Sequence, residues 1–378
     1  MKVLYIYTAL LTKGGADRVL TEKANYLAEH GYDVGIITDS QMGRPPVFPL
    51  SSMVKLINLD IDFAKEYGHS FPVRIYMYFK LMRQYKRAMK TVIERERPDI
   101  IISTMGRDLD FLTDICGCAS IIGEAHTTKK FLRNFHLLEQ KGLFYRLLVR
   151  YWRCKMDKNV KKLDAIVLLT KEDAESWSGL TKTVVIPNSL PFYSERQSDL
   201  ISKQAIVVGR YNNAKGYEYL VNAWKIIHDY YPDWIVNIYG SGEEQEHVRN
   251  MIYDNNMQDT MIMNEPTDNI MEKYLESSIC IVSSRYEGFS MVLLEAMACG
   301  LPCVSFDCPY GPRNIIHNGE DGFLVEYLNV EKLAQQVCAL MESHDLRKAI
   351  GLRAHSNIQR FSKENVMKEW MALFNSVK

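Results

Sequence analysis

Short apolar runs alternate with longer amphipathic segments along the first half of the chain. The runs have the length of strands, and glycine or proline residues separate several of them from the segments that follow. Strands that alternate with helices form a parallel sheet with both faces covered. The first half is therefore predicted to be a doubly wound α/β domain. Its predicted strands are residues 3–8, 33–38, 54–59, 100–103, 120–123, 165–169 and 184–186.

The same pattern starts again after residue 203. A strand at residues 205–209 ends in a glycine turn, and a helix follows at residues 217–230. The polar stretch 191–202 contains proline and serine and is the predicted linker. A chain of 378 residues suits two domains, which we place at residues 1–190 and 203–360. The further predicted strands are residues 234–239, 261–263, 279–283 and 302–306.

One strand end in the second half concentrates candidate chemistry. Residues 284–302 read SRYEGFSMVLLEAMACGLP, with Glu287 just after a strand and Glu295 inside the apolar run that follows. Between them, Gly288-Phe289-Ser290 forms a small-residue turn that opens a helix. A strand, a glycine turn and a helix N-terminus offer free backbone N–H groups to an anion. Carboxylates on both sides of that anion site suit a nucleotide sugar, whose sugar, diphosphate and ribose lie in line.

This block resembles the donor-site signature of the retaining group 1 (family 4) glycosyltransferases, with EGF-S at its start and EAMA-x-G-x-P at its end. The resemblance implies the GT-B architecture, in which two Rossmann-like domains face a central cleft. It also implies that the last helix, within residues 361–378, packs back on the first domain. Glu287 would bind the donor sugar and position its ring, and Glu295 would bind the ribose. Backbone groups of Gly288, Phe289 and Ser290 would help to hold the diphosphate.

The resemblance assigns further residues of the second half to the donor. Arg210 and Lys215 follow the strand at residues 205–209 and correspond to the family's pair of cations on the diphosphate. Both would stabilise the negative charge that grows on the leaving phosphate. Gly240, in the run Gly240-Ser241-Gly242, and residues 264–266 match the segments that hold the base.

In the first half, Gly14-Gly15 ends the first strand, and the family has a glycine loop there against the donor phosphate and the acceptor. Gly15 is the predicted donor contact in that loop. His126 follows the strand at residues 120–123 and corresponds to a histidine that reaches the donor sugar, so we group it with Glu287 as catalytic. Glu124 either orients this ring or is a simple surface acid. Asn188 and Arg107 are weaker candidates.

Two features test the resemblance. Asn314 stands after Arg313 where the family usually has a glutamate, which puts a charged role at that position in doubt. The sequences Asp60-Ile61-Asp62 and Asp108-Leu109-Asp110 have the form that binds a divalent metal in the other major glycosyltransferase fold. Nothing else indicates that fold, and Arg210 and Lys215 would do the work of the cation. We therefore expect no metal and no cofactor.

The net charge of zero hides a difference between the halves. Residues 1–190 carry 29 basic and 21 acidic side chains, and residues 191–378 carry 17 and 25. Within residues 129–162 there are 11 basic side chains and two acidic ones, and residues 74–97 form a second basic segment. Basic amphipathic helices with aromatic residues bind anionic membranes; the alternative is two ordinary helices with a solvated basic side. No nucleic-acid motif is present. The interleaved aromatic residues are Phe131, Phe135, Phe144, Tyr145, Tyr151, Trp152, Tyr76, Tyr78, Phe79 and Tyr85.

The cysteines and the N-terminal residues indicate the compartment. The eight cysteines include no C-x-x-C pair, so buried free thiols in a reducing cytoplasm are expected rather than a zinc site. The first apolar run is short and contains Tyr5 and Tyr7, as a buried strand does and a signal peptide does not. No apolar stretch has the length of a spanning helix. We expect a cytoplasmic protein, either free or on the inner membrane face.

Together these features predict a retaining glycosyltransferase that moves a hexose from a nucleotide diphosphate sugar, preferably a UDP-sugar, to a hydroxyl of a growing glycan. The glycan would be carried on a lipid diphosphate at the membrane surface. A sugar-nucleotide epimerase of the same fold and a non-catalytic two-domain sugar-binding protein are the alternatives. A Rossmann oxidoreductase would need a G-x-G-x-x-G after the first strand, and Gly14-Gly15 does not supply it.

Overall fold

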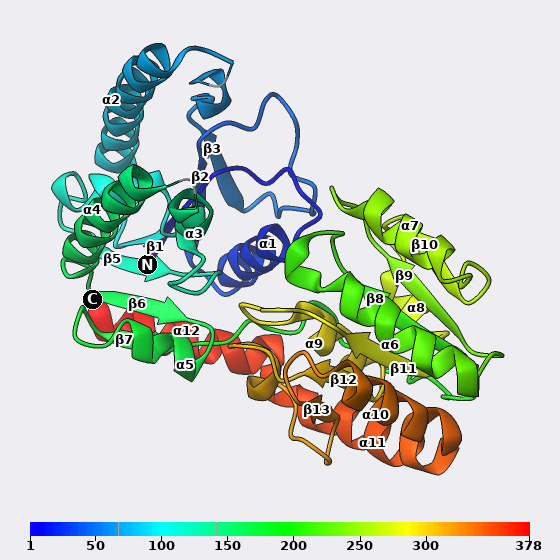
Figure 1. Ribbon diagram of the computed structural model, residues 1–378. Coiled ribbons are helices and arrows are strands. Elements are labelled where there is room, and N and C mark those ends of the chain that lie inside the picture. The colour runs from blue at the N-terminus through cyan, green and yellow to red at the C-terminus, as the bar shows by residue number, and fades with distance from the viewer. Residues whose placement is uncertain (67, 141) are drawn as a thin grey trace. The chain divides into compact units, whose positions relative to one another are not determined.

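The computed structural model describes residues 1–66, 68–140 and 142–378. The chain forms two compact units, each with its own parallel sheet (Figure 1). Unit 1 contains Met1–Pro187 and Val366–Lys378, and unit 2 contains Asn188–Asn365. The final stretch of the chain thus belongs with the first unit.

Unit 1 is built on a seven-stranded sheet of order β3-β2-β1-β4-β5-β6-β7, with every neighbouring pair parallel. This confirms the doubly wound sheet that the apolar runs predict. The order reverses between β1 and β4, which are neighbours. The strands are β1 (Lys2–Tyr7), β2 (Asp33–Thr38), β3 (Val54–Asn58), β4 (Ile100–Ser103), β5 (Ser120–Glu124), β6 (Ala165–Leu168) and β7 (Thr183–Val185).

Successive side chains of these strands enter different cores, because a strand points them to opposite faces. On β1, Leu4 and Ile6 pack in the core that includes α2 and α4. Val3 and Tyr5 pack in the core that includes α1 and α12. Both faces are therefore buried, which explains why the strands read as continuous apolar runs. The helices of unit 1 are α1 (Gly15–Glu29), α2 (Phe71–Glu96), α3 (Phe135–Glu139), α4 (Leu143–Val160), α5 (Lys171–Ser176) and α12 (Lys363–Val377), which starts in unit 2.

Unit 2 has a six-stranded parallel sheet of order β10-β9-β8-β11-β12-β13. The order reverses between β8 and β11, so this is the switch point at which ligands of such sheets bind. Its last strand, β13, was not among the strands predicted from the sequence. The strands are β8 (Gln204–Val208), β9 (Ile235–Tyr239), β10 (Met261–Asn264), β11 (Ile279–Val282), β12 (Cys303–Phe306) and β13 (Phe323–Val325). The helices are α6 (Tyr217–Tyr230), α7 (Gln245–Asp254), α8 (Ile270–Leu275), α9 (Met291–Ala298), α10 (Val330–Glu342) and α11 (His344–Asn357).

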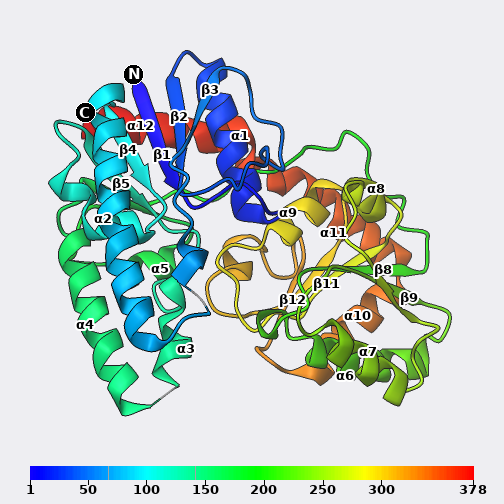
Figure 2. The same ribbon diagram turned by 90° about the horizontal axis from the view of Figure 1, so that it is seen from above.

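Helix α12 completes the core of unit 1. Trp370, Leu373 and Phe374 are buried against β1 and α1. At its end, the Ser120 hydroxyl donates to the Val377 carbonyl at 2.6 Å. Figures 1 and 2 show the helix in red beside strands of unit 1. None of the helices within the described residues is long and apolar enough to span a membrane.

Replacement of Phe374 by alanine should lower the free energy of unfolding of unit 1 by about 3–5 kcal/mol, because the fully buried ring leaves a cavity. Chemical denaturation followed by tryptophan fluorescence measures the loss. The matched control is Phe79→Ala on α2, where the ring is 60% exposed; it should change stability by no more than about 0.5 kcal/mol. Equal losses in the two variants would contradict the packing of α12.

Candidate functional site

The loops that follow β8, β9, β11 and β12 meet at the carboxyl edge of the unit 2 sheet. They approach so closely that a side chain at Gly240 would place its Cβ 1.9 Å from the Gly209 carbonyl oxygen. A Cβ on Gly242, whose φ is +159°, would lie 2.4 Å from the Tyr211 oxygen. Since these contacts are with backbone, no side-chain movement relieves them. The glycines at this edge are therefore needed to bring the β8 and β9 loops together.

Lys215 and Glu287 form an ion pair at the switch point. Lys215 Nζ lies 2.8 Å from Glu287 Oε1, and the Ser284 hydroxyl donates to the same oxygen at 2.6 Å. The lysine stem passes over Gly209, where an added Cβ would lie 3.0 Å from Lys215 Cε. The two charged side chains are 22% and 11% exposed, so each remains open to solvent and to a ligand.

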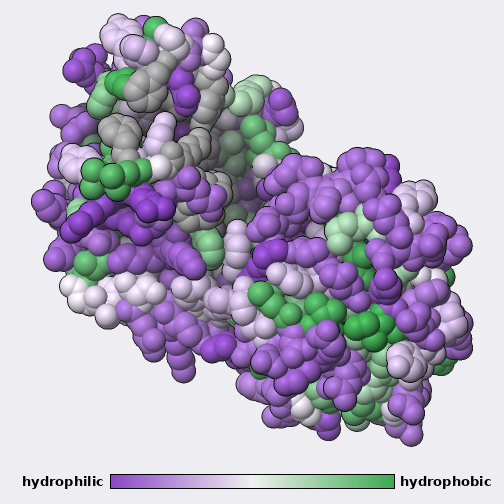
Figure 3. All heavy atoms as spheres, viewed as in Figure 1, coloured by the Kyte–Doolittle hydropathy of each residue, from purple (hydrophilic) through white to green (hydrophobic). Residues whose placement is uncertain are grey.

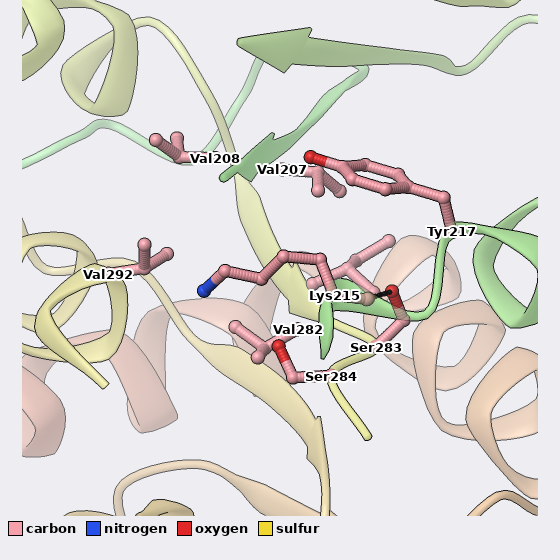
Figure 4. A pocket seen from close by; sticks show the side chains of 9 residues that line it. Val207, Val208, Lys215, Tyr217, Val282, Ser283, Ser284 and Val292 are labelled. Carbon is pink, nitrogen blue, oxygen red and sulfur yellow. Dashed lines mark hydrogen bonds between the residues drawn. The ribbon is translucent and has the colours of Figure 1, made fainter. Parts of the chain in front are cut away.

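A cavity of about 10 Å³ lies beside this lysine between β8, β11 and α9. Figure 4 shows the Lys215 amine extended towards Val208 and Val292, with Ser284 on the side of β11. Four valines and an isoleucine form its apolar wall: Val207, Val208, Val282, Val292 and Ile281. The wall fixes the lysine stem while its charged end stays at the edge.

The segment from Glu287 to Ser290 is held by the loop after β12. Glu287 forms a bridge with Tyr310, and a Cβ on Gly311 would lie 2.7 Å from Glu287 Cβ and 3.4 Å from the Ser290 nitrogen. Ser290 precedes the first residue of α9, and its buried hydroxyl oxygen has no hydrogen-bond partner within the described part of the chain. The first amide groups of α9 are thus presented at the same edge as Lys215 and Glu287.

Glu295 lies one turn into α9 and accepts a hydrogen bond from the Tyr274 hydroxyl at 2.9 Å. Burial and the nearby carboxylate of Glu295 hold the pKa of the Tyr274 phenol well above its usual value. The phenol therefore remains a donor at physiological pH. Tyr274 comes from α8, and no signal in the sequence indicated this partner.

The other candidates of unit 2 also lie at this edge. Arg210 is exposed on the loop after β8 and makes no ion pair with any residue of the described ranges. The Asn188 amide lies 3.5 Å from the sulfur of Met291, the first residue of α9. Asn314 donates to the Tyr310 carbonyl, which gives this departure from the family pattern a role in shaping the loop. The Asp307 carboxylate binds Arg313 at 2.9 and 2.7 Å.

In unit 1, one buried carboxylate organises the glycine loop. Asp17 accepts from the Tyr7 hydroxyl at 2.7 Å and from the Thr12 amide at 2.8 Å. It thereby ties the end of β1 to the start of α1, with Gly14 and the exposed Gly15 between them. No signal in the sequence indicated this role of Asp17.

Glu124 proves to be buried rather than a surface acid. It is 1% exposed and forms an ion pair with Lys23, which is 3% exposed. His126 Nε2 lies 3.3 Å from Glu124 Oε1, and the ring is 12% exposed. Burial lowers the pKa of His126 despite the nearby carboxylate, so the ring is neutral at pH 7. Lys23 takes an apolar position three residues after Leu20 in α1, and this pattern was the available signal for its burial.

Arg107 belongs to a second polar cluster of unit 1. Its guanidinium lies 4.4 Å from the centre of the Phe63 ring and acts on the buried carboxyl of Asp39. Burial raises the pKa of Asp39 to about 6, and the charge of Asp108 adds to the rise, while Tyr85 and Arg107 oppose it. This cluster lies at the ends of β2 and β4.

The two D-x-D sequences serve the local structure. Asp62 accepts from the Ala64 amide at 2.8 Å, and Asp110 binds Arg133 and Lys155 at 3.2 and 2.9 Å. Asp108 accepts from the Ser103 hydroxyl at 2.5 Å. Within the described residues, no three or more His, Cys, Asp and Glu side chains form a group that could hold a metal ion.

Comparison with known proteins finds two families that together match most of the chain. Residues 13–191 match glycosyltransferase family 4, and residues 194–356 match the glycosyl transferases group 1. The chain is 25% identical to an uncharacterized glycosyltransferase of Haemophilus influenzae, over 98% of this chain and 99% of the relative. It is 26% identical to the amylovoran biosynthesis glycosyltransferase AmsD of Erwinia amylovora, over 99% of each chain.

Solved structures share the fold at low sequence identity. TarM of Staphylococcus aureus, solved in a complex that includes UDP, superposes with a TM-score of 0.77 at 14% identity, over 99% of each chain. Sucrose-phosphate synthase of Thermosynechococcus elongatus gives 0.79 at 19% identity, over 100% of this chain and 99% of the other. HepE of Anabaena, in complex with UDP and glucose, gives 0.72 at 16%, over 100% of each chain. The fold is therefore GT-B.

The stability of unit 1 should fall as the pH rises from about 4 to 6, because folded Asp39 keeps its proton up to about pH 6 while unfolded aspartate loses it near pH 3.8. The folded state binds more protons in this range. The contribution of Asp39 to the free energy of unfolding is therefore fully present below about pH 4 and is lost as the pH rises to about 6. The loss is about 3 kcal/mol at most. Thermal unfolding across pH measures the slope.

Asp39→Asn should flatten this pH dependence and raise stability at pH 7, because the amide resembles the protonated carboxyl. Asp229→Asn, on an exposed position of unit 2, is the matched control and should leave the slope unchanged. An unaltered slope in Asp39→Asn would contradict the assignment.

Proposed function

Because the chain belongs to the group 1 glycosyltransferases of family 4, we propose that it transfers a hexose from a UDP-sugar to a hydroxyl group of a growing glycan, with retention of the donor's anomeric configuration. The observation that carries the proposal is the ion pair of Lys215 and Glu287 at the switch point of unit 2. It puts a cation for phosphate and a carboxylate for sugar hydroxyls within 2.8 Å of each other.

The diphosphate would bind Arg210, Lys215 and the first amide groups of α9. Lys215 would then exchange the Glu287 carboxylate for a phosphate oxygen, which frees Glu287 to accept hydrogen bonds from the sugar. Ser284, which donates to Glu287, would hold the carboxylate in place during this exchange. A charge-assisted contact of this kind gains strength as the leaving phosphate becomes more negative.

The ribose hydroxyls would bind Glu295, whose orientation is set by Tyr274. The base would lie against the backbone of the Gly240-Ser241-Gly242 turn and residues 264–266. Gly240 suits this role because a side chain would separate the turn from the β8 loop. Gly15 would face the donor phosphate from the glycine loop of unit 1.

In the reaction, the acceptor oxygen forms a bond to the anomeric carbon while the bond from that carbon to the β-phosphate oxygen breaks. The acceptor proton passes to the leaving phosphate on the same face of the sugar. Glu287 positions the sugar ring, and neutral His126 contacts the sugar from unit 1 when the enzyme closes on its substrates. No covalent intermediate with Glu287 is required.

The relatives support the choice of substrates. TarM and HepE were each solved in complex with UDP, the second also with glucose, and AmsD is named for amylovoran biosynthesis. We propose that Arg210 and Lys215 neutralise the diphosphate, so that transfer needs no divalent metal and continues in EDTA. A sugar-nucleotide epimerase would leave the sugar on UDP, and a non-catalytic sugar-binding protein would form no new product.

Glu287→Gln should reduce transfer from a UDP-sugar by about 10²–10³-fold, since the amide cannot accept both hydroxyl bonds in the transition state. UDP affinity, measured by calorimetry, should remain within about threefold, because UDP lacks the sugar. The matched control is Glu331→Gln on the exposed face of α10, which should keep full activity. Unchanged transfer in Glu287→Gln, or transfer abolished by EDTA, would contradict the proposal.

We also propose that unit 1 docks on an anionic membrane that carries the lipid-linked acceptor. Along α4, Leu143, Leu147 and Tyr151 are 61–73% exposed and follow one another every four residues, on one face of the helix. Beside them, Arg146, Arg150 and other residues line a surface cavity of about 720 Å³. Figure 3 shows apolar surface, in green, among polar surface in the region of α4. Phe144 falls on this helix, but its side chain lies outside the described residues.

Helix α2 extends this face. Its exposed apolar residues lie near its start, and charges of Asp110 and Lys155 act on Tyr78, which places α2 beside α4 (Figure 2). An exposed apolar stripe next to arginines suits the interface of an anionic bilayer. The enzyme would therefore work on the inner membrane face. The exposed apolar residues of α2 are Val73, Ile75, Tyr76 and Phe79.

The double variant Leu147→Ser/Tyr151→Ser should bind vesicles of phosphatidylglycerol and phosphatidylcholine about tenfold more weakly or worse, because it loses apolar burial at the interface. Vesicle flotation at several salt concentrations measures binding. The matched control is Leu352→Ser/Tyr230→Ser, which removes an exposed leucine and an exposed tyrosine of unit 2. Equal binding of both variants would contradict membrane docking through α4.

A further inference from the structure

Unit 1 buries a pair of opposite charges behind His126. Glu124 is the last residue of β5 and points to the face that α1 and α12 cover. Lys23 reaches it from α1, and both side chains are almost completely buried. Such a pair is retained only where its geometry is well fixed, because each charge loses its hydration. The proposed reaction does not by itself account for Lys23.

The C-terminal helix closes over this lysine. The ring of Trp370, on α12, lies with its centre 4.3 Å from Lys23 Nζ, and the ring of Tyr5 lies 5.7 Å away on β1. An aromatic face stabilises a cation that has been taken out of water. Trp370 is 2% exposed and therefore has one well-defined place in the core. The lysine is thus fixed by the carboxylate on one side and by an indole ring on another.

The same carboxylate also faces His126. Glu124 Oε1, which Lys23 binds, is also the atom 3.3 Å from His126 Nε2. The second carboxylate oxygen, Glu124 Oε2, has no hydrogen-bond partner within the described residues. Among Trp370, Lys23, Glu124 and His126, only the histidine has an appreciably exposed side chain, at 12%.

We propose that Trp370 and Lys23 hold the Glu124 carboxylate in one position, and that this carboxylate in turn positions the His126 ring for the donor sugar. The inference rests on the proposed role of His126 in transfer. It makes Lys23, Glu124 and Trp370 positioning residues, and it gives α12 a part in the reaction beyond the core of unit 1.

The charges around His126 make the proposal testable by titration. Burial and the Lys23 cation lower the pKa of His126, whereas Glu124 and Asp17 raise it. Tyr5 and Tyr7 also face the cluster, and burial keeps both phenols uncharged, with pKa values above their usual range. Removal of Lys23 and removal of the Glu124 charge should therefore shift the histidine in opposite directions.

The experiment follows the ring resonance of His126 by NMR on the full chain with isotope-labelled histidine, identified by its loss in His126→Asn. In the wild type, His126 should titrate below the usual 6.5. Lys23→Met should raise this pKa and Glu124→Gln should lower it further, each by about half a unit or more. Trp370→Leu should raise it towards 6.5, because water reaches the cluster, and Trp370→Phe should change it least.

The controls repeat the substitutions at a second lysine–tryptophan contact of unit 1. Lys129 Nζ lies 4.7 Å from the centre of the Trp177 ring, and the Lys129 charge is not among those that act on His126. Lys129→Met and Trp177→Leu should leave the His126 pKa unchanged. Equal shifts in the control variants would mean that general loosening of unit 1 moves the histidine, and the proposal would be overturned.

A split in the kinetics separates positioning from folding. Glu124→Gln should lower kcat for transfer about tenfold or more while UDP affinity stays within about twofold, because the nucleotide binds to unit 2. Shifts of the same sign in Lys23→Met and Glu124→Gln, or a wild-type pKa at or above 6.5, would overturn the proposal. If Lys23→Met does not fold, the result for Glu124→Gln tests the proposal alone, because Glu124→Gln is the variant expected to lower the pKa of His126.

Failure of the proposed function gives a different result. The titration uses no substrate, so opposite shifts without any transfer would reject the glycosyl transfer and keep the coupling of Lys23, Glu124 and His126. Transfer with no shifts would reject the coupling and keep the function.

Discussion

The parallel pairing of β8 with β11 is the constraint on which the site of unit 2 depends. Cys280 of β11 stands opposite Ile206 of β8. From this pair, the order of strands continues through β9 and β10 on one side and through β12 and β13 on the other. The loops that leave β8 and β11 are consequently adjacent but belong to helices on different sides. Lys215 and Glu287, 72 residues apart in the chain, meet there. Their ion pair follows from strand order, and the glycines at 209 and 240 make the approach possible.

The ion pairs of the two units differ in how far they are exposed to solvent. In unit 2, the ion pair of Lys215 and Glu287 is partly exposed, so exchanging one partner for a phosphate oxygen requires little rearrangement. In unit 1, the pair of Lys23 and Glu124 is buried, and removing one partner would leave a charge in the core at a cost of about 3–5 kcal/mol. The open pair suits a side chain that changes partners on binding. The buried pair suits one that must stay in place.

Much of the fold could be predicted from the sequence, because both sheets are buried on both faces and their strands are continuous apolar runs. The run at residues 279–283 with its glycine turn predicted β11 and α9, and the match to GT-B structures confirms the architecture. The three-residue β13 was not predicted, although β7, which has the same length, was. Within the site, the types of residue at the strand ends were visible, whereas the contacts that orient them were not. No sequence signal indicated that Tyr274 contacts Glu295 or that Ser284 contacts Glu287. The sequences of α8 and of the loop after β11 do not show which residues lie opposite them.

By itself, the sequence determined the class of this protein: two doubly wound domains, with carboxylates, cations and glycines at the ends of particular strands. This follows because periodicity and turn residues act locally and need no knowledge of neighbours. Only the tertiary structure decided which charges are paired and how deeply they lie. Glu124 and Lys23 are a buried pair under Trp370, a residue almost 350 positions after Lys23, because α12 packs on unit 1. Long-range pairing arises from packing between distant segments, and no local pattern encodes which segments meet.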